Sequence, residues 1–266
     1  MCGRGRSTIA SPGGPTEPQR PPFGPSRPAR GPLAEDAVDW NAAIDNYCER
    51  LGPEFWAEPL NAVTNAAFVV AALVALRVAL RRRSLDWPLA VLVAITLAVG
   101  VGSFLFHTVA TRWAAFADIV PIQLFILTYF ALAMRRFVGI AWWAAGAATV
   151  GFIVFSVAGG ALLDRAGVSL NGSEGYLPPL AALLLVGVAL VLSGRRGPGG
   201  ALIVAAAIFA VSLTFRTVDM AVCAALPIGT HFLWHTLNGL LLGYLLIAMV
   251  RFGRPQAAGA ARAMPR

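Results

Sequence analysis

The chain has 266 residues and a net charge of +8, but only 13% of its residues are charged, 58% are hydrophobic and the mean hydropathy is +0.70. Soluble globular domains contain about 25% charged residues, so this composition excludes an ordinary soluble domain and indicates an integral membrane protein. All 21 basic residues are arginine. The lack of lysine excludes a seven-helix retinal protein, which needs a Schiff-base lysine.

The N-terminal residues differ from the rest of the chain. Residues 1–38 hold eight prolines and five arginines but few apolar side chains. Such a segment cannot bury enough surface to fold alone, and it lacks the continuous apolar core of a signal peptide. We therefore predict a disordered Pro/Gly/Arg-rich tail at 1–38, a membrane domain at 39–252 and a cytoplasmic tail at 253–266.

Apolar runs of about the length that crosses a bilayer follow the tail, with short connectors between them. We place seven of these runs, of which the fifth is the shortest, at residues 61–80, 88–107, 115–134, 138–158, 176–193, 200–218 and 229–250. The sequence therefore predicts an all-α integral membrane protein with seven transmembrane helices.

Arginine is distributed unequally between alternate connectors. One set carries most of the arginines, namely Arg81, Arg82, Arg83, Arg135, Arg136, Arg195, Arg196, Arg251 and Arg254. The other set carries Arg112, Arg165 and little else. Basic connectors face the cytoplasm, so we predict that the N-terminus is outside and the C-terminus is cytoplasmic.

The chain has only three histidines, and all of them fall at the predicted outer ends of spans. His107 closes the second span, while His231 and His235 open the seventh and, four residues apart, share a helix face. Asp118 lies at the outer start of the third span. A lone intramembrane histidine often makes only a helix–helix hydrogen bond. Three at one depth beside a carboxylate favour a shared metal site, because ionisable side chains in spans are costly.

Three neutral imidazoles and one open position form the ligand pattern of a catalytic zinc site. The spacing of His231 and His235 is that of the H-E-x-x-H motif, but residues 232–234 are Phe, Leu and Trp, so the usual glutamate base is missing. Asp118 is the candidate replacement. Ser103, one turn before His107, is a candidate for stabilising an oxyanion or holding a zinc-bound water; alternatively, it bonds its own helix backbone.

Ser-x3-His in the second span, Asp in the third and His-x3-His in the seventh resemble the signature of a superfamily of seven-span hydrolases. This superfamily includes the alkaline ceramidases and the progestin/adipoQ receptors. The stretch DNYCERLGPEFWAEPLNAVTN before the first span resembles the N-terminal motif of the alkaline ceramidases. The resemblance, to a bacterial-type member, covers about residues 45–250.

This resemblance implies zinc-dependent hydrolysis of the N-acyl amide of ceramide, or of a related N-acyl sphingolipid, to a sphingoid base and a fatty acid. It implies that His107, His231 and His235 bind zinc, that Ser103 assists the oxyanion and that Asp118 moves the proton. The expected partners are a ceramide-like lipid and the bilayer, with no nucleic acid. Compact loops and the absence of lysine favour a bacterial inner membrane with the site near the periplasmic face.

The resemblance also implies a calcium site in the segment before the first span, with Asp45, Glu49 and Glu58 as ligands. Asp45 lies one residue farther from Glu49 than the family pattern has it, and Leu51 stands where the family has Asn. Calcium takes six to eight oxygen ligands, so these departures predict weak binding or none. The alternative is that the loop is an ordinary acidic start of a helix.

Cys48 and Cys223 both lie outside in the predicted topology, where thiols can oxidise. As in the related ceramidases, we expect a disulfide between them; the alternative is two free thiols.

Three other functions remain to be weighed against a ceramidase. A lipid-sensing receptor of the same superfamily would use the same histidines without turnover. A haem electron carrier would need axial ligands on opposite sides of the haem, which two histidines on one helix face do not provide. A transporter would be indicated by internal repeats or broken helices, and we find neither.

Overall fold

The computed structural model describes residues 38–253, so the predicted tails at 1–38 and 253–266 lie outside the described residues except for Val38 and Gly253. Within this range the chain is helical and forms no strand, only an isolated bridge between Ala43 and Thr111. Seven helical segments are long and apolar enough to cross a membrane: Pro59–Arg81, Trp87–Val109, Arg112–Val138, Trp142–Arg165, Glu174–Leu192, Arg196–Val222 and His231–Phe252. This confirms the seven predicted helices, of which the fifth is the shortest.

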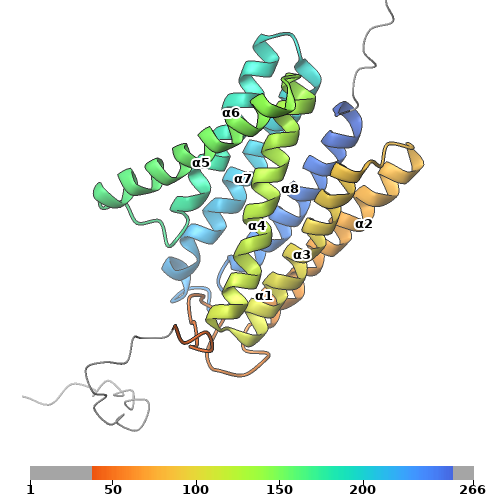
Figure 1. Cartoon of the computed structure of the whole chain (residues 1–266). Helices are drawn as coiled ribbons and strands as arrows, with labels where there is room; N and C mark the ends of the chain where they lie inside the picture. Colours follow the sequence, from red (N-terminus) through yellow and green to blue (C-terminus); the bar gives the residue numbers. More distant parts are fainter. Residues whose placement is uncertain (1–37, 254–266) are drawn as a thin grey trace, which may run out of the picture. The chain divides into compact units, whose positions relative to one another are not determined.

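The helices follow one another in chain order (Figure 1). They are α1 (Pro59–Thr64), α2 (Ala66–Arg81), α3 (Trp87–Val109), α4 (Arg112–Ala133), α5 (Trp142–Arg165), α6 (Leu177–Leu192), α7 (Arg196–Val222) and α8 (His231–Phe252). A π-helical turn, η1 (Met134–Val138), extends α4, and a 3-10 turn, η2 (Glu174–Tyr176), precedes α6. The first span is divided at Asn65 into α1 and α2.

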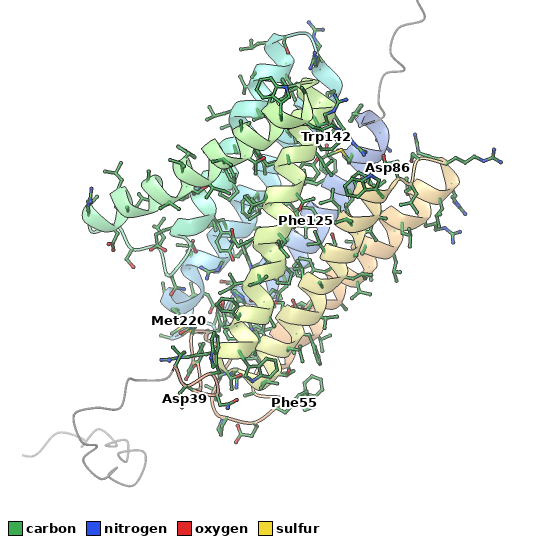
Figure 2. All side chains as sticks on the ribbon, viewed as in Figure 1. Asp39, Phe55, Asp86, Phe125, Trp142 and Met220 are labelled. Atoms are coloured by element: carbon green, nitrogen blue, oxygen red, sulfur yellow. A yellow bond between two sulfur atoms is a disulfide. The ribbon has the colours of Figure 1, made fainter. Side chains whose placement is uncertain are left out.

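The two ends of the helices differ in their chemistry. One end, here called the arginine-rich end, carries Arg136 and Arg195; Arg136 pairs with Asp86 at 2.7 Å, and Arg195 donates to the carbonyl oxygen of Phe137 at 2.6 Å. The opposite end, here called the site end, carries all three histidines. Figure 2 shows Asp86 at the arginine-rich end and Asp39 at the site end.

Local sequence explains where α3 begins and ends. The Asp86 carboxylate accepts a hydrogen bond from the Leu89 amide at 3.1 Å, and Pro88 occupies the first turn, where no amide donor is needed. At the site end, Ala110 adopts a left-handed conformation with φ 49° and stops the helix three residues after His107. The chain therefore turns directly into α4, which carries Asp118.

Small residues let the helices that carry the site approach one another closely. A Cβ atom added at Gly102 of α3 would lie 2.0 Å from the carbonyl oxygen of Ala117 in α4. One added at Gly239 of α8 would lie 2.6 Å from the Cβ of Ala67 in α2. Tight contacts of this kind are the usual basis of helix packing in membranes, because lipid gives helices no hydrophobic reason to associate. They fix the helices that carry the histidines.

Candidate metal centre and its apolar pocket

The three histidines meet at the site end. His107 comes from the last turn of α3, while His231 and His235 come from the first two turns of α8. One ring nitrogen from each lies within 4.8 Å of the other two, and all three side chains are buried. In the part of the chain that the structure describes, this is the only group of three or more His, Cys, Asp or Glu side chains with metal-binding spacing.

Hydrogen bonds on the outer side of two rings orient them. The Nδ1 atom of His107 lies 2.5 Å from Oε2 of Glu58, and Nδ1 of His235 lies 3.2 Å from Oγ1 of Thr64. The Thr64 hydroxyl donates to the Leu60 carbonyl oxygen at 2.7 Å, so His235 is the donor to Thr64. Both rings thereby keep Nε2 available for a ligand.

Two buried ring nitrogens have no hydrogen-bond partner in the described residues, namely Nε2 of His107 and Nδ1 of His231. Buried polar atoms almost always find a partner, and an orphan indicates a bound ion, a water or a catalytic role. Three neutral nitrogen donors at this spacing suit Zn²⁺, which accepts histidine nitrogen at about 2.0–2.1 Å. The residues present therefore fit a zinc ion.

Glu58, which the family resemblance implied as a calcium ligand, is instead the partner of His107. Its Oε2 also accepts from Nδ2 of Asn61 at 3.0 Å, and its Oε1 accepts from Nε of Arg50. Burial raises the pKa of this carboxyl, but its hydrogen bonds with His107, Asn61 and Arg50 outweigh that effect, and the net pKa lies below its ordinary value. An ionised carboxylate on the outer nitrogen of a histidine is the usual partner of a metal ligand.

The carboxylates expected to bind calcium have other partners. Oε1 of Glu49 accepts from the Leu60 amide at 2.7 Å and Oε2 accepts from the Asn61 amide at 2.8 Å, so Glu49 caps the start of α1. Asp45 is exposed. Within residues 38–253, Asp45, Glu49 and Glu58 do not gather into a cation-binding group. The nitrogen donors that occupy Glu49 and Glu58 explain why.

Ser103 and Asp118 meet beside the histidines. Ser103 is buried on α3, one turn before His107, and its side chain lies near that of Asp118. Asp118 also lies near His107, and its Oδ1 is a buried atom with no hydrogen-bond partner in the described residues. The close α3–α4 contact at Gly102 brings the two side chains together.

Asp219 was missed because the sixth span was expected to end at residue 218, whereas α7 continues to Val222. The buried Oδ1 of Asp219 accepts from the amides of Thr230 at 2.6 Å and His231 at 2.9 Å, and so fixes the start of α8. Gly229 lies between α7 and α8 with φ 63°, and a Cβ there would lie 2.2 Å from Oδ1 of Asp219. The acidic residue in an apolar run and the nearby glycine were the available signals.

A disulfide joins Cys48 to Cys223, with their Cα atoms 5.4 Å apart, in the pairing expected from the sequence. The Cys48 amide also donates to Oδ2 of Asp219 at 3.0 Å. The segment before α1 is therefore tied to the C-terminal end of α7 by one covalent bond and one hydrogen bond. This attachment places Tyr47 directly over the histidines.

Tyr47 and Arg216 were also missed by the sequence analysis. The Tyr47 ring stacks on His231 with centroids 3.8 Å apart, and burial raises the pKa of its hydroxyl. The Arg216 guanidinium lies over the rings of Tyr176, at 5.3 Å, and Trp234, at 5.7 Å. Tyr47 thus covers His231 from the segment before α1, while Arg216 of α7 contacts Trp234, the residue before His235, and only the fold shows these contacts.

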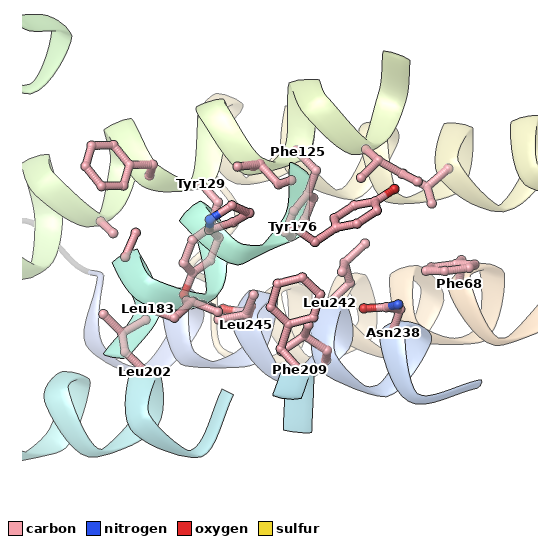
Figure 3. A pocket seen from close by; sticks show the side chains of 18 of the residues that line it. Phe68, Phe125, Tyr129, Tyr176, Leu183, Leu202, Phe209, Asn238, Leu242 and Leu245 are labelled. Atoms are coloured by element: carbon pink, nitrogen blue, oxygen red, sulfur yellow. Dashed lines mark hydrogen bonds between the residues drawn. The ribbon is translucent and has the colours of Figure 1, made fainter. Parts of the chain in front are cut away.

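An apolar pocket extends from His235 into the helical bundle (Figure 3). Ser103, Trp234 and His235 line one end of it, and Met134 and Leu202 line the other, towards the arginine-rich end. Figure 3 shows Phe125 and Tyr176 between Asn238 and Leu202, with mostly apolar side chains along the pocket. This arrangement places the polar side chains of Ser103 and His235 at one end of an otherwise mostly apolar pocket, which suits a hydrocarbon chain.

A family model described as Ceramidase matches residues 41–166 of this chain. The match supports the resemblance to the alkaline ceramidases, which implies a hydrolase acting on the ceramide amide bond. It includes Glu58, Ser103, His107 and Asp118, but it ends before the helix that carries His231 and His235. No curated protein matches the chain.

Proposed function

We propose that this protein is a zinc-dependent amidohydrolase that cleaves the N-acyl amide of ceramide, or of a related N-acyl sphingolipid. The products are a sphingoid base and a fatty acid. The observation that carries the proposal is the cluster of three buried histidines, two of them with an unpartnered ring nitrogen, one of which, His235, lines an apolar pocket. The Ceramidase match supports a ceramide substrate.

His107, His231 and His235 would hold the zinc ion, whose chemistry is to polarise an amide carbonyl and to activate water near neutral pH. The surrounding residues hold these three histidines in position. Glu58 and Thr64 fix the rings of His107 and His235 through their Nδ1 atoms. The Asp219 cap fixes the backbone of His231, while Tyr47 covers its ring.

Asp118 is the proposed general base and acid. Its unpartnered Oδ1 would take a proton from the attacking water as the oxygen bonds to the carbonyl carbon. The same carboxyl would then give this proton to the amide nitrogen as the carbon–nitrogen bond breaks, which releases the amine. We propose that Ser103, which lies near Asp118, holds this carboxyl in place and that its hydroxyl turns to the carbonyl oxygen as negative charge develops there.

The proposed orientation in the membrane follows from the two ends of the helices. We propose that the arginine-rich end faces the cytoplasm, in keeping with the positive-inside rule, and that the N-terminus and the site end face outward. The amide of a ceramide lies at headgroup depth, so it would reach the histidines while its acyl chain enters the apolar pocket. In a bacterial inner membrane, this is the periplasmic face.

Turnover by the purified protein tests this function against a lipid receptor. The wild type in detergent should release sphingoid base from ceramide, and His235→Ala should reduce this release at least about 10³-fold. Thr236→Ala changes the next residue, which is exposed, and should retain activity. A wild-type protein that binds ceramide without releasing sphingoid base would favour the receptor and overturn the proposal.

A further inference from the structure

A buried arginine lies in the segment for which the family resemblance implies a calcium ion. Arg50 is 7% exposed, and its guanidinium donates to three oxygen acceptors. Nε donates to Oε1 of Glu58, one terminal nitrogen donates to the Gly52 carbonyl oxygen at 3.1 Å, and the other donates to the His107 carbonyl oxygen at 3.0 Å. One carboxylate and two backbone oxygens thus surround a single positive charge.

The residues of this segment do not fit a calcium ion. Calcium needs six to eight oxygen ligands. Both carboxylate oxygens of Glu49 and both of Glu58 already accept hydrogen bonds from nitrogen donors. A metal cation on Glu58 would also lie close to the Arg50 guanidinium, and like charges at that distance repel strongly in a buried setting.

Arg50 also connects to the candidate metal centre at two points. Glu58 accepts from Arg50 through Oε1 and contacts Nδ1 of His107 through Oε2. The same guanidinium binds the backbone carbonyl of His107. Arg50 therefore holds both the carboxylate that orients the His107 ring and the main chain that carries this ring.

We propose that the Arg50 guanidinium replaces calcium in this segment as a cation built into the chain. It neutralises Glu58, fixes it against His107 and so acts as a positioning residue for the zinc centre. The protein consequently requires no calcium. This inference rests on the proposed function only for the zinc ion; the structural role of Arg50 stands apart from the identity of the substrate.

The planar guanidinium is needed for this role. Its three nitrogens each donate to a different acceptor from a rigid planar fork, whereas an ammonium group is a compact point charge without that fork. Arg50→Lys keeps the charge and should restore the arrangement only in part. Arg50→Gln removes the charge and leaves the Glu58 carboxylate buried without its cationic partner.

The test measures zinc affinity and thermal unfolding of the purified full-length protein, with calcium chloride or a calcium chelator added. For the wild type, neither addition should change the unfolding temperature. Arg50→Gln should weaken zinc binding about 10- to 100-fold, as loss of support for a metal ligand does. It should also lower the unfolding temperature by about 10 °C. The zinc affinity and unfolding temperature of Arg50→Lys should lie between those of the wild type and Arg50→Gln.

Arg112→Gln provides the matched control, because Arg112 is an exposed arginine near the same end of α3 and should leave both quantities unchanged. The inference is overturned if calcium stabilises the wild type, or if Arg50→Gln unfolds at the wild-type temperature. Neither readout depends on ceramide turnover. A protein with these properties that fails to hydrolyse ceramide would contradict the proposed function and leave the inference intact.

Discussion

Helices α8 and α5 are similar in length and hydropathy but have different surroundings. They have 22 and 24 residues and hydropathies of 1.6 and 1.9, yet 61% of the most apolar stretch of α8 is buried in the protein against 6% for α5. Figure 1 shows α5 diverging from the other helices, whereas α8 runs beside α2 and α3. Hydropathy therefore identifies a span without revealing whether protein or lipid surrounds it.

Glycine illustrates the same difference. A Cβ atom at Gly239 or Gly243 of α8 would lie 2.6 or 3.1 Å from a Cβ atom of α2, whereas one at Gly146 or Gly151 of α5 would meet nothing within 4 Å. The glycines of α8 permit a close helix contact, which positions the histidines of the site. Gly146 and Gly151 of α5 face open space, which is consistent with a helix exposed to lipid.

The largest effect on activity should come from replacing the proposed catalytic carboxyl, Asp118, by a side chain of the same shape. Asp118→Asn keeps the volume of the side chain but cannot accept the proton, so the rate of ceramide hydrolysis should fall about 10²- to 10⁴-fold. Zinc content should stay at the wild-type level. Asp164→Asn, which changes an exposed carboxylate of α5, should retain full activity. Full activity of Asp118→Asn would remove this residue from the chemistry.

A smaller effect should follow from loss of the cap that begins α8. Asp219→Ala removes the acceptor for three backbone amides, and we expect a loss of about 1–3 kcal/mol in unfolding free energy together with weaker zinc binding. Asp86→Ala removes the cap of α3 at the arginine-rich end, so thermal unfolding and zinc titration of both variants form a matched pair. Asp86→Ala should lose stability but keep its zinc affinity. Equal zinc affinities in the two variants would contradict the positioning role of Asp219.

The smallest effects should have opposite signs in the two helices. Gly239→Ala introduces a methyl group against Ala67 and should destabilise the protein by about 1–3 kcal/mol. Gly151→Ala in α5 meets no neighbour and should be neutral or stabilise by up to about 1 kcal/mol, because alanine favours the helix. Thermal unfolding in the same detergent distinguishes them. A Gly239→Ala protein as stable as Gly151→Ala would refute the close α2–α8 contact.

The sequence sufficed for the spans because each is a continuous apolar run, and their observed limits lie within seven residues of the predicted ones. It also sufficed to place the three histidines at one end, because successive spans run in opposite directions, so the end of the second span and the start of the seventh lie on the same side. That argument gives depth in the membrane but not lateral neighbours. The meeting of the three ring nitrogens depends on helix contacts such as the one at Gly239, which hydropathy does not reveal.

The supporting residues could not be predicted for the same reason. Glu58 contacts a histidine 49 residues away, and Asp219 binds the amides of Cys48 and His231 on either side of it in the sequence. The family resemblance implied that Glu58 binds calcium. A motif shows which positions are acidic, but it does not show which hydrogen-bond donors lie next to them in the fold. Arg50, beside Glu49 in the sequence, gave no sign that its guanidinium turns to Glu58.

The central claim is that the three histidines hold one zinc ion on which hydrolysis depends. The most direct measurement is the zinc content of the active wild-type protein, determined across the peak of a size-exclusion column together with sphingoid-base release. We predict about one zinc per chain, eluting with the activity and lost together with it on chelation. Active protein that contains no zinc would contradict the account.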